Sequence, residues 1–298
     1  MGMQIAVLGS TGMLGTGVLD YFHSEDIPVI EISRNSTGIH PNNRHIQFDI
    51  TQDPISKLIV GLSADSFLIN ASGIIKHKIN SNSLEDLADA IKVNSVFPHE
   101  LSEKCMARNI RIFQIATDCV YSGEHGNYSE ADRHDPTDIY GVTKSLGEGE
   151  SQNVMTLRCS MIGLERDSSY EFLNWVIDQP LNQTIQGFEN HLWNGLTTLH
   201  VAKILKGIID MEGFREGLHH LVPKDFTSKL ELIEIVASEF ERQDLVVEKS
   251  KGDKGVDRRL ITVDHDRNRD YWKWAGYSQP LGISEMIAEY KDWTSKLR

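Results

Sequence analysis

The feature that most constrains this chain is a glycine-rich segment near its N-terminus, lying between a short apolar run and a helical pattern. Ile5–Leu8 is typical of a buried strand, and Met13–His23 has the periodicity of an amphipathic helix. The intervening turn reads Gly9-Ser10-Thr11-Gly12-Met13-Leu14-Gly15. Glycines allow a tight turn and a close approach to a diphosphate, and a helix N-terminus offers free N–H groups. These seven residues are therefore predicted to contact a dinucleotide, with an unliganded glycine turn as the competing interpretation.

Short apolar runs and helical patterns alternate through the first half of the chain. Further strands are predicted at Pro28–Ser33, His45–Phe48, Ser66–Asn70, Arg111–Ala116 and Val154–Arg158. Further helices are predicted at Pro54–Leu62, Leu84–Arg108 and Ile139–Ser151. Such alternation gives parallel strands with helices on both faces, joined by right-handed crossovers. The predicted fold class is α/β, a doubly wound parallel sheet of the Rossmann type, with residues 1–158 as the dinucleotide-binding domain.

The second half is less regular. Helices are predicted at Ser169–Asp178, Leu199–Glu212, Ser228–Glu239 and Met286–Leu297, with a strand at Leu218–Val222. We expect residues 159–298 to form a smaller C-terminal α/β region that binds substrate, part of it returning to the first domain. Ligands of open α/β sheets bind at the carboxyl edge of the strands, where such a region would lie.

Composition excludes several classes of protein. With 43 acidic and 30 basic residues the formal net charge is −13, which disfavours binding to nucleic acid or to an anionic membrane. Three unclustered cysteines argue against a disulfide framework and against a zinc site, and we assign no metal. No apolar run is long enough to span a bilayer and no signal peptide is evident, so a cytoplasmic location is expected.

The end of the second strand indicates which dinucleotide is bound. An NAD site usually places an acidic residue here to bond the ribose 2′-hydroxyl, but Ser33 and Arg34 stand in its place. Arginine pairs with a 2′-phosphate that a carboxylate would repel, so NADP(H) is predicted, with NAD(H) as the alternative. Glu31 lies inside the strand and is not expected to reach the ribose. Asp49 and Ile50, after the third strand, are predicted adenine contacts, although Asp49 equally suits a helix cap.

Three residues suit acid–base chemistry on a carbonyl. Tyr140 and Lys144 lie four apart on a predicted helix and therefore share one face. An ammonium beside a phenol favours the phenolate, which lowers the pKa of a group that normally titrates near 10. Thr117 ends the fifth strand, where its hydroxyl would polarise a substrate carbonyl. Each feature alone is common as a solvated helix face or a strand end, and their order along the chain gives them weight.

Together these features resemble the extended short-chain dehydrogenase/reductase family over roughly the first 165 residues. Asn70-Ala71-Ser72-Gly73 resembles the family segment that follows the fourth strand and contacts the cofactor. Asn94 resembles the asparagine of the long fourth helix, which holds that helix's backbone and a proton-relay water in the family. The resemblance implies that Tyr140 and Lys144 also contact the nicotinamide ribose.

Within this superfamily, the chain looks most like the dTDP-4-dehydrorhamnose reductases. The resembling segments are 116–123, 135–148 and 157–160. The resemblance implies hydride transfer to the keto group of a nucleotide-linked deoxysugar with proton donation by Tyr140, a role in cell-surface polysaccharide sugar synthesis, and a homodimer. Substrate contacts are expected from Thr117, Asp118, Cys119, Met161, Trp193 and Asn194. The family often has Tyr at Cys119 and an aromatic residue near Met161, so the usual substrate is in doubt.

Several alternatives stay open. A 4,6-dehydratase would need an acid where Cys119 stands, and a 4-epimerase would use the same threonine, tyrosine and lysine with tightly held NAD. An epimerase/reductase resembling GDP-fucose synthase would use Cys119 as an acid–base group, with His191 as the candidate partner. A buried structural thiol is the more usual role. Finally, some relatives are non-catalytic NADP-binding regulatory subunits.

Overall fold

The computed structural model describes residues 3–166 and 171–297, and the chain divides into two compact units. The first unit contains Met1–Tyr121, Arg133–Arg158 and Phe214–His219. The second contains Ser122–Asp132, Cys159–Gly213 and His220–Arg298. Each unit thus includes a short segment from the other half of the chain: 214–219 belong to the first unit, and 122–132 belong to the second.

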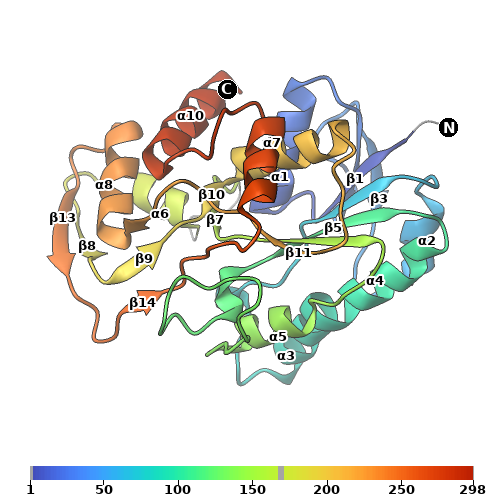
Figure 1. The fold of residues 1–298 in the computed structure, drawn as a ribbon, viewed down its shortest axis with the longest axis horizontal. Coiled ribbons are helices and arrows are strands. Elements are labelled where there is room, and N and C mark those ends of the chain that lie inside the picture. The colour runs from blue at the N-terminus through green and yellow to red at the C-terminus, as the bar shows by residue number, and fades with distance from the viewer. Residues whose placement is uncertain (1–2, 167–170, 298) are drawn as a thin grey trace. The chain divides into compact units, whose positions relative to one another are not determined.

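A seven-stranded sheet organises the first unit (Figure 1), in the order β11-β6-β5-β4-β1-β2-β3. Its strands are β1 (Ile5–Leu8), β2 (Val29–Ser33), β3 (Arg44–Gln47), β4 (Phe67–Asn70), β5 (Arg111–Ala116), β6 (Val154–Arg158) and β11 (Gly217–His220). The pairings from β3 across to β6 are all parallel. The order reverses direction beside β1, as in a doubly wound sheet, so the predicted fold class is confirmed.

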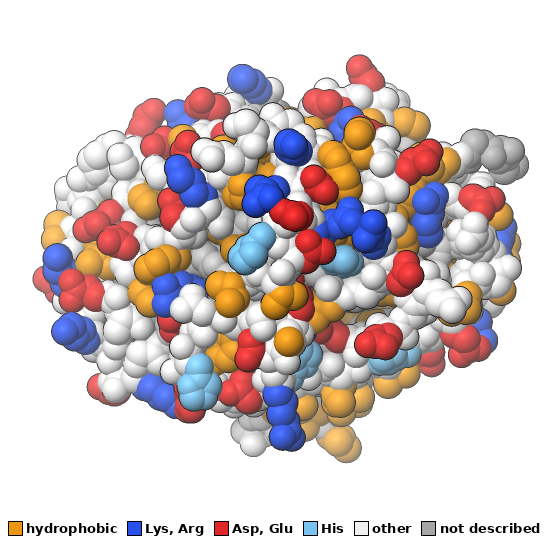
Figure 2. All heavy atoms as spheres, in the orientation of Figure 1, with side chains coloured by type: hydrophobic (Ala, Val, Ile, Leu, Met, Phe, Trp, Pro, Cys, Tyr) orange, Lys and Arg blue, Asp and Glu red, His pale blue; other side chains and the backbone are white. Residues whose placement is uncertain are grey.

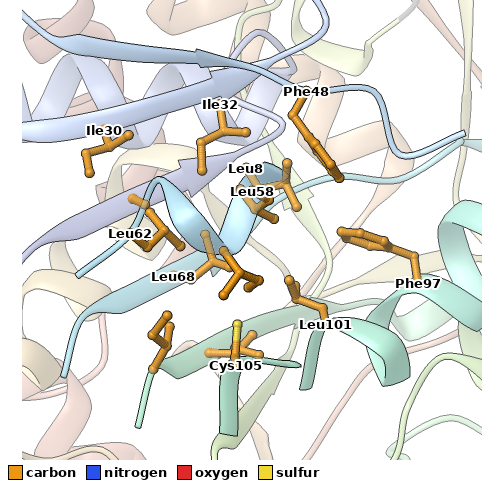
Figure 3. Close-up of a cluster of buried hydrophobic side chains, with 14 of the residues drawn as sticks. Leu8, Ile30, Ile32, Phe48, Leu58, Leu62, Leu68, Phe97, Leu101 and Cys105 are labelled. Carbon is orange, nitrogen blue, oxygen red and sulfur yellow. The ribbon is translucent and has the colours of Figure 1, made fainter. Parts of the chain in front are cut away.

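The strands at the centre of this sheet are apolar because both of their faces are covered. Every residue of β1, β2 and β4 is buried. Helix α1 (Met13–Ser24) packs on β1 and β2. A cluster that includes Leu8, Ile32, Phe48, Phe97 and Leu101 fills the space between the sheet and helices α2 (Ile55–Val60) and α4 (Phe97–Met106) (Figure 3).

The predicted helix Leu84–Arg108 is interrupted. It consists of α3 (Leu84–Ile91), one π-helical turn (Lys92–Val96) and α4. Pro98, in the first turn of α4, has no N–H to donate to the carbonyl four residues earlier, that of Asn94, which accounts for the break. Helix α5 (Ile139–Leu146) is also shorter than the predicted helix, which extended to Ser151. Its last residue is Leu146, and Gly147 is its C-cap.

The second unit holds five helices in its described part: α6 (Phe172–Ile177), α7 (Thr198–Asp210), α8 (Lys229–Glu239), α9 (His265–Trp274) and α10 (Ile283–Lys296). Its short strands are β7 (Met161–Ile162), β8 (Thr184–Phe188), β9 (His191–Trp193), β10 (Leu196–Thr197), β12 (Thr227–Ser228), β13 (Val246–Ser250) and β14 (Val256–Asp257). They form the small sheets β10-β7, β12-β9-β14 and β13-β8. These strands and α9 were not predicted, and the predicted helix Ser169–Asp178 begins outside the described residues.

Candidate active site

The glycine turn after β1 has the shape of a diphosphate cradle. Gly9 has φ +80°, and a Cβ there would lie 2.8 Å from the Ser72 nitrogen. A Cβ on Gly15 would lie 2.1 Å from the Gly9 carbonyl oxygen. Folding alone therefore requires these two glycines. Gly12 differs, because a Cβ there would meet the Gly9 oxygen at 3.5 Å, an ordinary contact. A ligand lying against the turn would explain why this position has no side chain.

The groups around Gly12 fit a dinucleotide diphosphate. Among the described residues, no side chain caps the N-terminus of α1, whose first N–H groups are thus left for another acceptor. The Ser10 hydroxyl is fully buried and has no hydrogen-bond partner within the described part of the chain. Thr11 is exposed, Met13 is half-buried and Leu14 is buried. A ligand oxygen would satisfy both the buried hydroxyl and the helix N–H groups.

The carboxyl end of β2 presents Ser33 and Arg34. Ser33 is buried, with its Oγ 3.1 Å from Nε2 of His45, whereas Arg34 is exposed. Glu31 is fully buried, and its carboxylate accepts hydrogen bonds from the Ile39 and His40 N–H groups. The acid in β2 is therefore used inside the protein, in agreement with the expectation that it does not reach the ribose.

Asp49 forms a turn at the end of the third strand. Its Oδ1 accepts hydrogen bonds from the N–H and the hydroxyl of Thr51, both at 2.8 Å. Ile50 packs against the apolar core beside α2. Asp49 thus forms a local turn and does not cap α2, whose N-cap is Pro54, so the helix-cap alternative is wrong, and an adenine contact stays a prediction.

The segment after β4 is held by two asparagines. Asn70 is buried and accepts from the Ser72 N–H at 3.2 Å and from the Ser72 hydroxyl. In the π-helical turn, Asn94 accepts from the Ile74 N–H at 2.9 Å and donates to the Ile74 carbonyl at 2.8 Å. Asn94 thus holds the backbone just after Ala71-Ser72-Gly73, which is a positioning role toward the predicted cofactor contacts.

Helix α5 carries two of the three predicted catalytic residues and packs against the segment that holds the third. Tyr140, in its first turn, is half-buried, and Thr117 is 9% exposed at the end of β5. A Cβ on Gly141 would lie 2.2 Å from the Cys119 carbonyl oxygen, so the first turn of α5 rests on the segment that follows Thr117. Asp118 is buried beside Thr117, with a 3.2 Å hydrogen bond between their side chains. Gly141 was not singled out from the sequence.

Lys144 lies one turn further along α5 and is buried. Its ammonium donates to the Ile115 carbonyl at 3.0 Å. Burial lowers the pKa of Lys144, and the nearby Glu148 carboxylate partly opposes that shift. A buried ammonium on the face of α5 that carries Tyr140 is the arrangement that favours a phenolate.

A buried ionic cluster fixes the far end of α5. The Arg158 side chain is fully buried, and its guanidinium pairs with Glu148 and donates to the Tyr121 hydroxyl at 2.7 Å. The same guanidinium lies 2.7 Å from Nε2 of His134, whose Nδ1 lies 2.7 Å from the Ser145 hydroxyl. Burial lowers the pKa of His134. Sequence reasoning missed this cluster, and the only signal was an arginine in an otherwise uncharged strand.

The second unit holds the remaining predicted substrate contacts. Met161 is half-buried in β7. Trp193 is 6% exposed, and its Nε1 donates to the Ser160 hydroxyl at 2.8 Å. The Asn194 side-chain amide is paired with the backbone N–H and carbonyl of Leu260, so it holds that segment. His191 stacks on Phe188, and its Nε2 lies 3.3 Å from the Lys254 carbonyl. Substrate contact by Met161, Trp193 and Asn194 stays a prediction.

Three further observations concern surface charge, membrane-spanning helices and metal ligands. Acidic and basic side chains are interspersed on the face shown in Figure 2, without a broad basic patch. Across residues 3–166 and 171–297, no helix is long and apolar enough to cross a bilayer. In the same ranges, no three His, Cys, Asp or Glu side chains gather as a metal site would require.

Comparisons with known proteins show the family and the fold of this chain. The model of the RmlD substrate binding domain family matches residues 3–256. A curated relative, the dTDP-4-keto-6-deoxy-D-glucose reductase of Streptomyces niveus, is 26% identical over 143 residues, which are 48% of this chain and 45% of that protein. The match thus spans less than half the length of that relative.

Solved structures agree on the fold. A dTDP-4-dehydrorhamnose reductase from Clostridium acetobutylicum superposes with a TM-score of 0.73 at 19% identity, covering 98% of this chain and 100% of that one. The Bacillus anthracis dTDP-4-dehydrorhamnose reductase, solved in complex with NADP, gives 0.72 at 15% identity, covering 97% and 99%. At such identities the likeness shows the fold alone. The family match, however, covers most of the chain, so this protein belongs to the RmlD substrate-binding-domain family, which confirms the resemblance seen in its sequence.

Proposed function

We propose that this chain is an NADP(H)-dependent oxidoreductase that reduces a keto group on a nucleotide-activated deoxysugar. The observation that carries the proposal is the placement of Lys144. Its buried ammonium lies one helical turn after Tyr140, on a helix whose first turn rests on the segment after Thr117. In the same unit, the glycine turn offers a cradle that fits a dinucleotide.

The positions of the glycine turn and of the strand ends indicate which residues would hold the dinucleotide. The turn from Gly9 to Gly15 takes the diphosphate, Ser33 and Arg34 take the 2′-phosphate, and Asp49-Ile50 lies toward the adenine. The segment 70–73, supported by Asn94, lines the strand edge beside it. When bound, NADPH supplies the hydride that reduces the substrate carbonyl.

The remaining chemistry is proton transfer by the protein. The Tyr140 hydroxyl gives its proton to the substrate oxygen as that oxygen gains negative charge. Lys144 stabilises the phenolate that is left, and it does so strongly because the ammonium is withdrawn from water. The Thr117 hydroxyl, which donates to the Asp118 carboxylate when no substrate is bound, turns its proton to the same substrate oxygen.

The substrate class follows from family membership and from the names of relatives. The Streptomyces niveus relative is named as a reductase of a dTDP-linked 4-keto-6-deoxy sugar. We infer a nucleotide-diphosphate sugar as substrate here, contacted by Asp118, Cys119, Met161, Trp193 and Asn194. A role in making sugars for cell-surface polysaccharides and assembly as a homodimer belong to the same proposal.

The test is oxidation of NADPH with a panel of 4-keto nucleotide sugars, followed by absorbance of the nicotinamide. Wild-type protein is expected to oxidise NADPH with at least one member. Tyr140→Phe should lose this activity by 100-fold or more, in line with the roughly 10²–10⁴-fold contribution of a positioned proton donor. Its NADPH affinity should change little.

Three results would overturn the proposal in different ways. NADPH binding without oxidation of any sugar would indicate a non-catalytic binding subunit. Inversion at a sugar carbon without net oxidation of cofactor would indicate an epimerase. Unchanged turnover in Tyr140→Phe would remove Tyr140 from the mechanism. Cys119→Ser serves as the matched probe for an epimerising thiol, and the reductase proposal expects it to remain active.

A further inference from the structure

The end of β2 carries a polar pair that sequence reasoning did not identify. Ser33 is the last residue of β2 and is 4% exposed, with its Oγ 3.1 Å from Nε2 of His45 on β3. In the register of these strands, Glu31 lies beside His45, and Ser33 lies beside Gln47. The imidazole therefore reaches along the sheet, past its own neighbour, toward the carboxyl edge where Ser33 stands.

The connection between β2 and β3 is anchored over this pair. Three donors satisfy the buried Glu31 carboxylate: the Ile39 N–H, the His40 N–H at 2.9 Å and the Asn43 side chain at 3.0 Å. A Cβ on Gly38 would lie 2.8 Å from Oε2 of Glu31 and 3.4 Å from the Cβ of His45, so a side chain there would displace the Glu31 carboxylate. The connection thus covers both Glu31 and His45.

Helix α1 holds the other side of the same connection. Nε2 of His40 lies 3.0 Å from Oδ1 of Asp20, and the His40 ring stacks on His23 with centroids 4.4 Å apart. The connection therefore binds Glu31 on one side and helix α1 on the other. The end of β2 presents to a ligand the Ser33 hydroxyl and the Arg34 guanidinium, and no carboxylate of its own.

We propose that His45 is a specificity-determining residue for the cofactor, acting through Ser33. When Nε2–H of His45 donates to the Ser33 oxygen, the hydroxyl proton is left to donate outward. A 2′-phosphate brings nearly two negative charges and accepts a charge-assisted hydrogen bond, which is stronger than a bond to a ribose hydroxyl. His45 is thus a positioning residue that favours NADP(H) over NAD(H). This inference rests on the proposed dinucleotide function.

The test measures dissociation constants of NADPH and NADH by quenching of tryptophan fluorescence, with no turnover required. His45→Leu removes the imidazole and should weaken NADPH about three- to tenfold, the range of one hydrogen bond, while NADH changes less than twofold. Ser33→Ala should weaken NADPH by at least as much. The double variant should match Ser33→Ala alone, because His45 acts only through that hydroxyl.

Three further variants separate orientation from simple support. His45→Gln keeps a donor near Ser33 and should restore most of the NADPH preference even if the leucine variant folds poorly. Arg34→Ala should add its loss to that of His45→Leu, since Arg34 would contact the phosphate independently. His99→Leu removes an imidazole bonded to the Leu146 carbonyl in the same unit and should leave both constants unchanged.

The outcomes are distinct. An unchanged ratio of the two constants in His45→Leu, or additive losses from His45→Leu and Ser33→Ala, would overturn the role of His45. Failure of the wild-type protein to bind either cofactor would instead overturn the proposed dinucleotide function. Equal weakening of NADPH and NADH in both His45 variants would mean that His45 only supports the strand.

Discussion

Replacing Gly12 by alanine separates a ligand cradle from a mere turn. Gly9 and Gly15 cannot make this distinction, because the protein itself needs them: a Cβ would lie 2.8 Å from the Ser72 nitrogen or 2.1 Å from the Gly9 oxygen. At Gly12 the nearest atom, the Gly9 oxygen, would be 3.5 Å away, and the backbone, with φ −79° and ψ 170°, is open to any residue.

The expected effect on folding is small because two terms oppose each other. Alanine restricts the unfolded chain, which stabilises a compatible site by about 0.4–1 kcal/mol. Alanine is a poorer N-cap than glycine, which costs up to about 1 kcal/mol. The free energy of unfolding of Gly12→Ala should therefore lie within about 1 kcal/mol of wild type, a change of about 4 °C or less in Tm.

The expected effect on NADPH is large. A methyl group on Gly12 would occupy the space where the diphosphate meets the N-terminus of α1, so both close contact and N–H donation would suffer. Loss of more than one charge-assisted hydrogen bond corresponds to at least a tenfold weaker Kd. Thermal unfolding and fluorescence titration, on the same samples, measure the two effects.

Gly255→Ala provides the matched control. This glycine is exposed in the second unit, and a Cβ there would meet the Asn190 backbone oxygen at 3.3 Å, a tighter contact than the 3.5 Å at Gly12. Gly255→Ala should therefore cost at least as much in Tm as Gly12→Ala and leave the Kd for NADPH unchanged. If Gly12→Ala keeps wild-type affinity for NADPH while remaining folded, the glycine turn is not the diphosphate site and the cofactor assignment is refuted.

Two further predictions concern stability. Arg158→Met should lower the free energy of unfolding in urea by about 3 kcal/mol, because it leaves the Glu148 carboxylate, whose side chain is only 11% exposed, without its cation. A loss below about 1 kcal/mol would contradict a structural role for the pair. Burial raises the pKa of Glu289, but hydrogen bonds, first among them the one with His200, outweigh burial. Together they lower the pKa of Glu289 from 4.5 to about 2. Since the pKa of Glu289 is lower in the folded than in the unfolded protein, its stabilisation is present above pH 4.5 and is lost as the pH falls toward 2. Glu289→Gln should therefore flatten the fall in Tm between pH 4.5 and pH 2. An equally steep fall in the variant would contradict this prediction.

The first unit was predictable because its signals are local. Buried parallel strands appear as short continuous apolar runs, so β1, β5 and β6 have the bounds that their sequence patterns indicate. The helices were less exact where one residue decides an end: Pro98 breaks the long helix before α4, and Gly147 ends α5. The apolar pattern of the sequence indicates neither the helix break at Pro98 nor the helix end at Gly147.

The second unit was harder for a physical reason. Strands of two or three residues, such as β7 and β14, are too short for an alternating pattern to stand out. Helix α9 has mostly charged or exposed residues and buries only Asn268, Tyr271 and Trp272, so its pattern resembles a solvated loop. Tertiary packing, and not local preference, sets these elements.

At the candidate active site, sequence spacing predicts the groups, and packing brings their segments together. Tyr140 and Lys144 are related by one helical turn, which sequence can state. Contact between Gly141 and the Cys119 carbonyl joins segments that are distant in sequence, and no spacing rule predicts it. The same holds for Arg158, whose partners become neighbours only when the sheet forms.

The choice between NADP and NAD shows most clearly what hydrogen bonding adds to sequence. The sequence argument rests on Ser33 and Arg34 replacing an acid, yet Glu31 is an acid only two residues earlier on the same face of the strand. Whether it repels a 2′-phosphate depends on where its carboxylate is held. Three donors from the 39–43 connection enclose it, and Gly38 allows the connection to come that close. We therefore expect cofactor preference to depend on the β2–β3 connection as a whole, so replacing Arg34 alone should not be enough to convert this site to NAD.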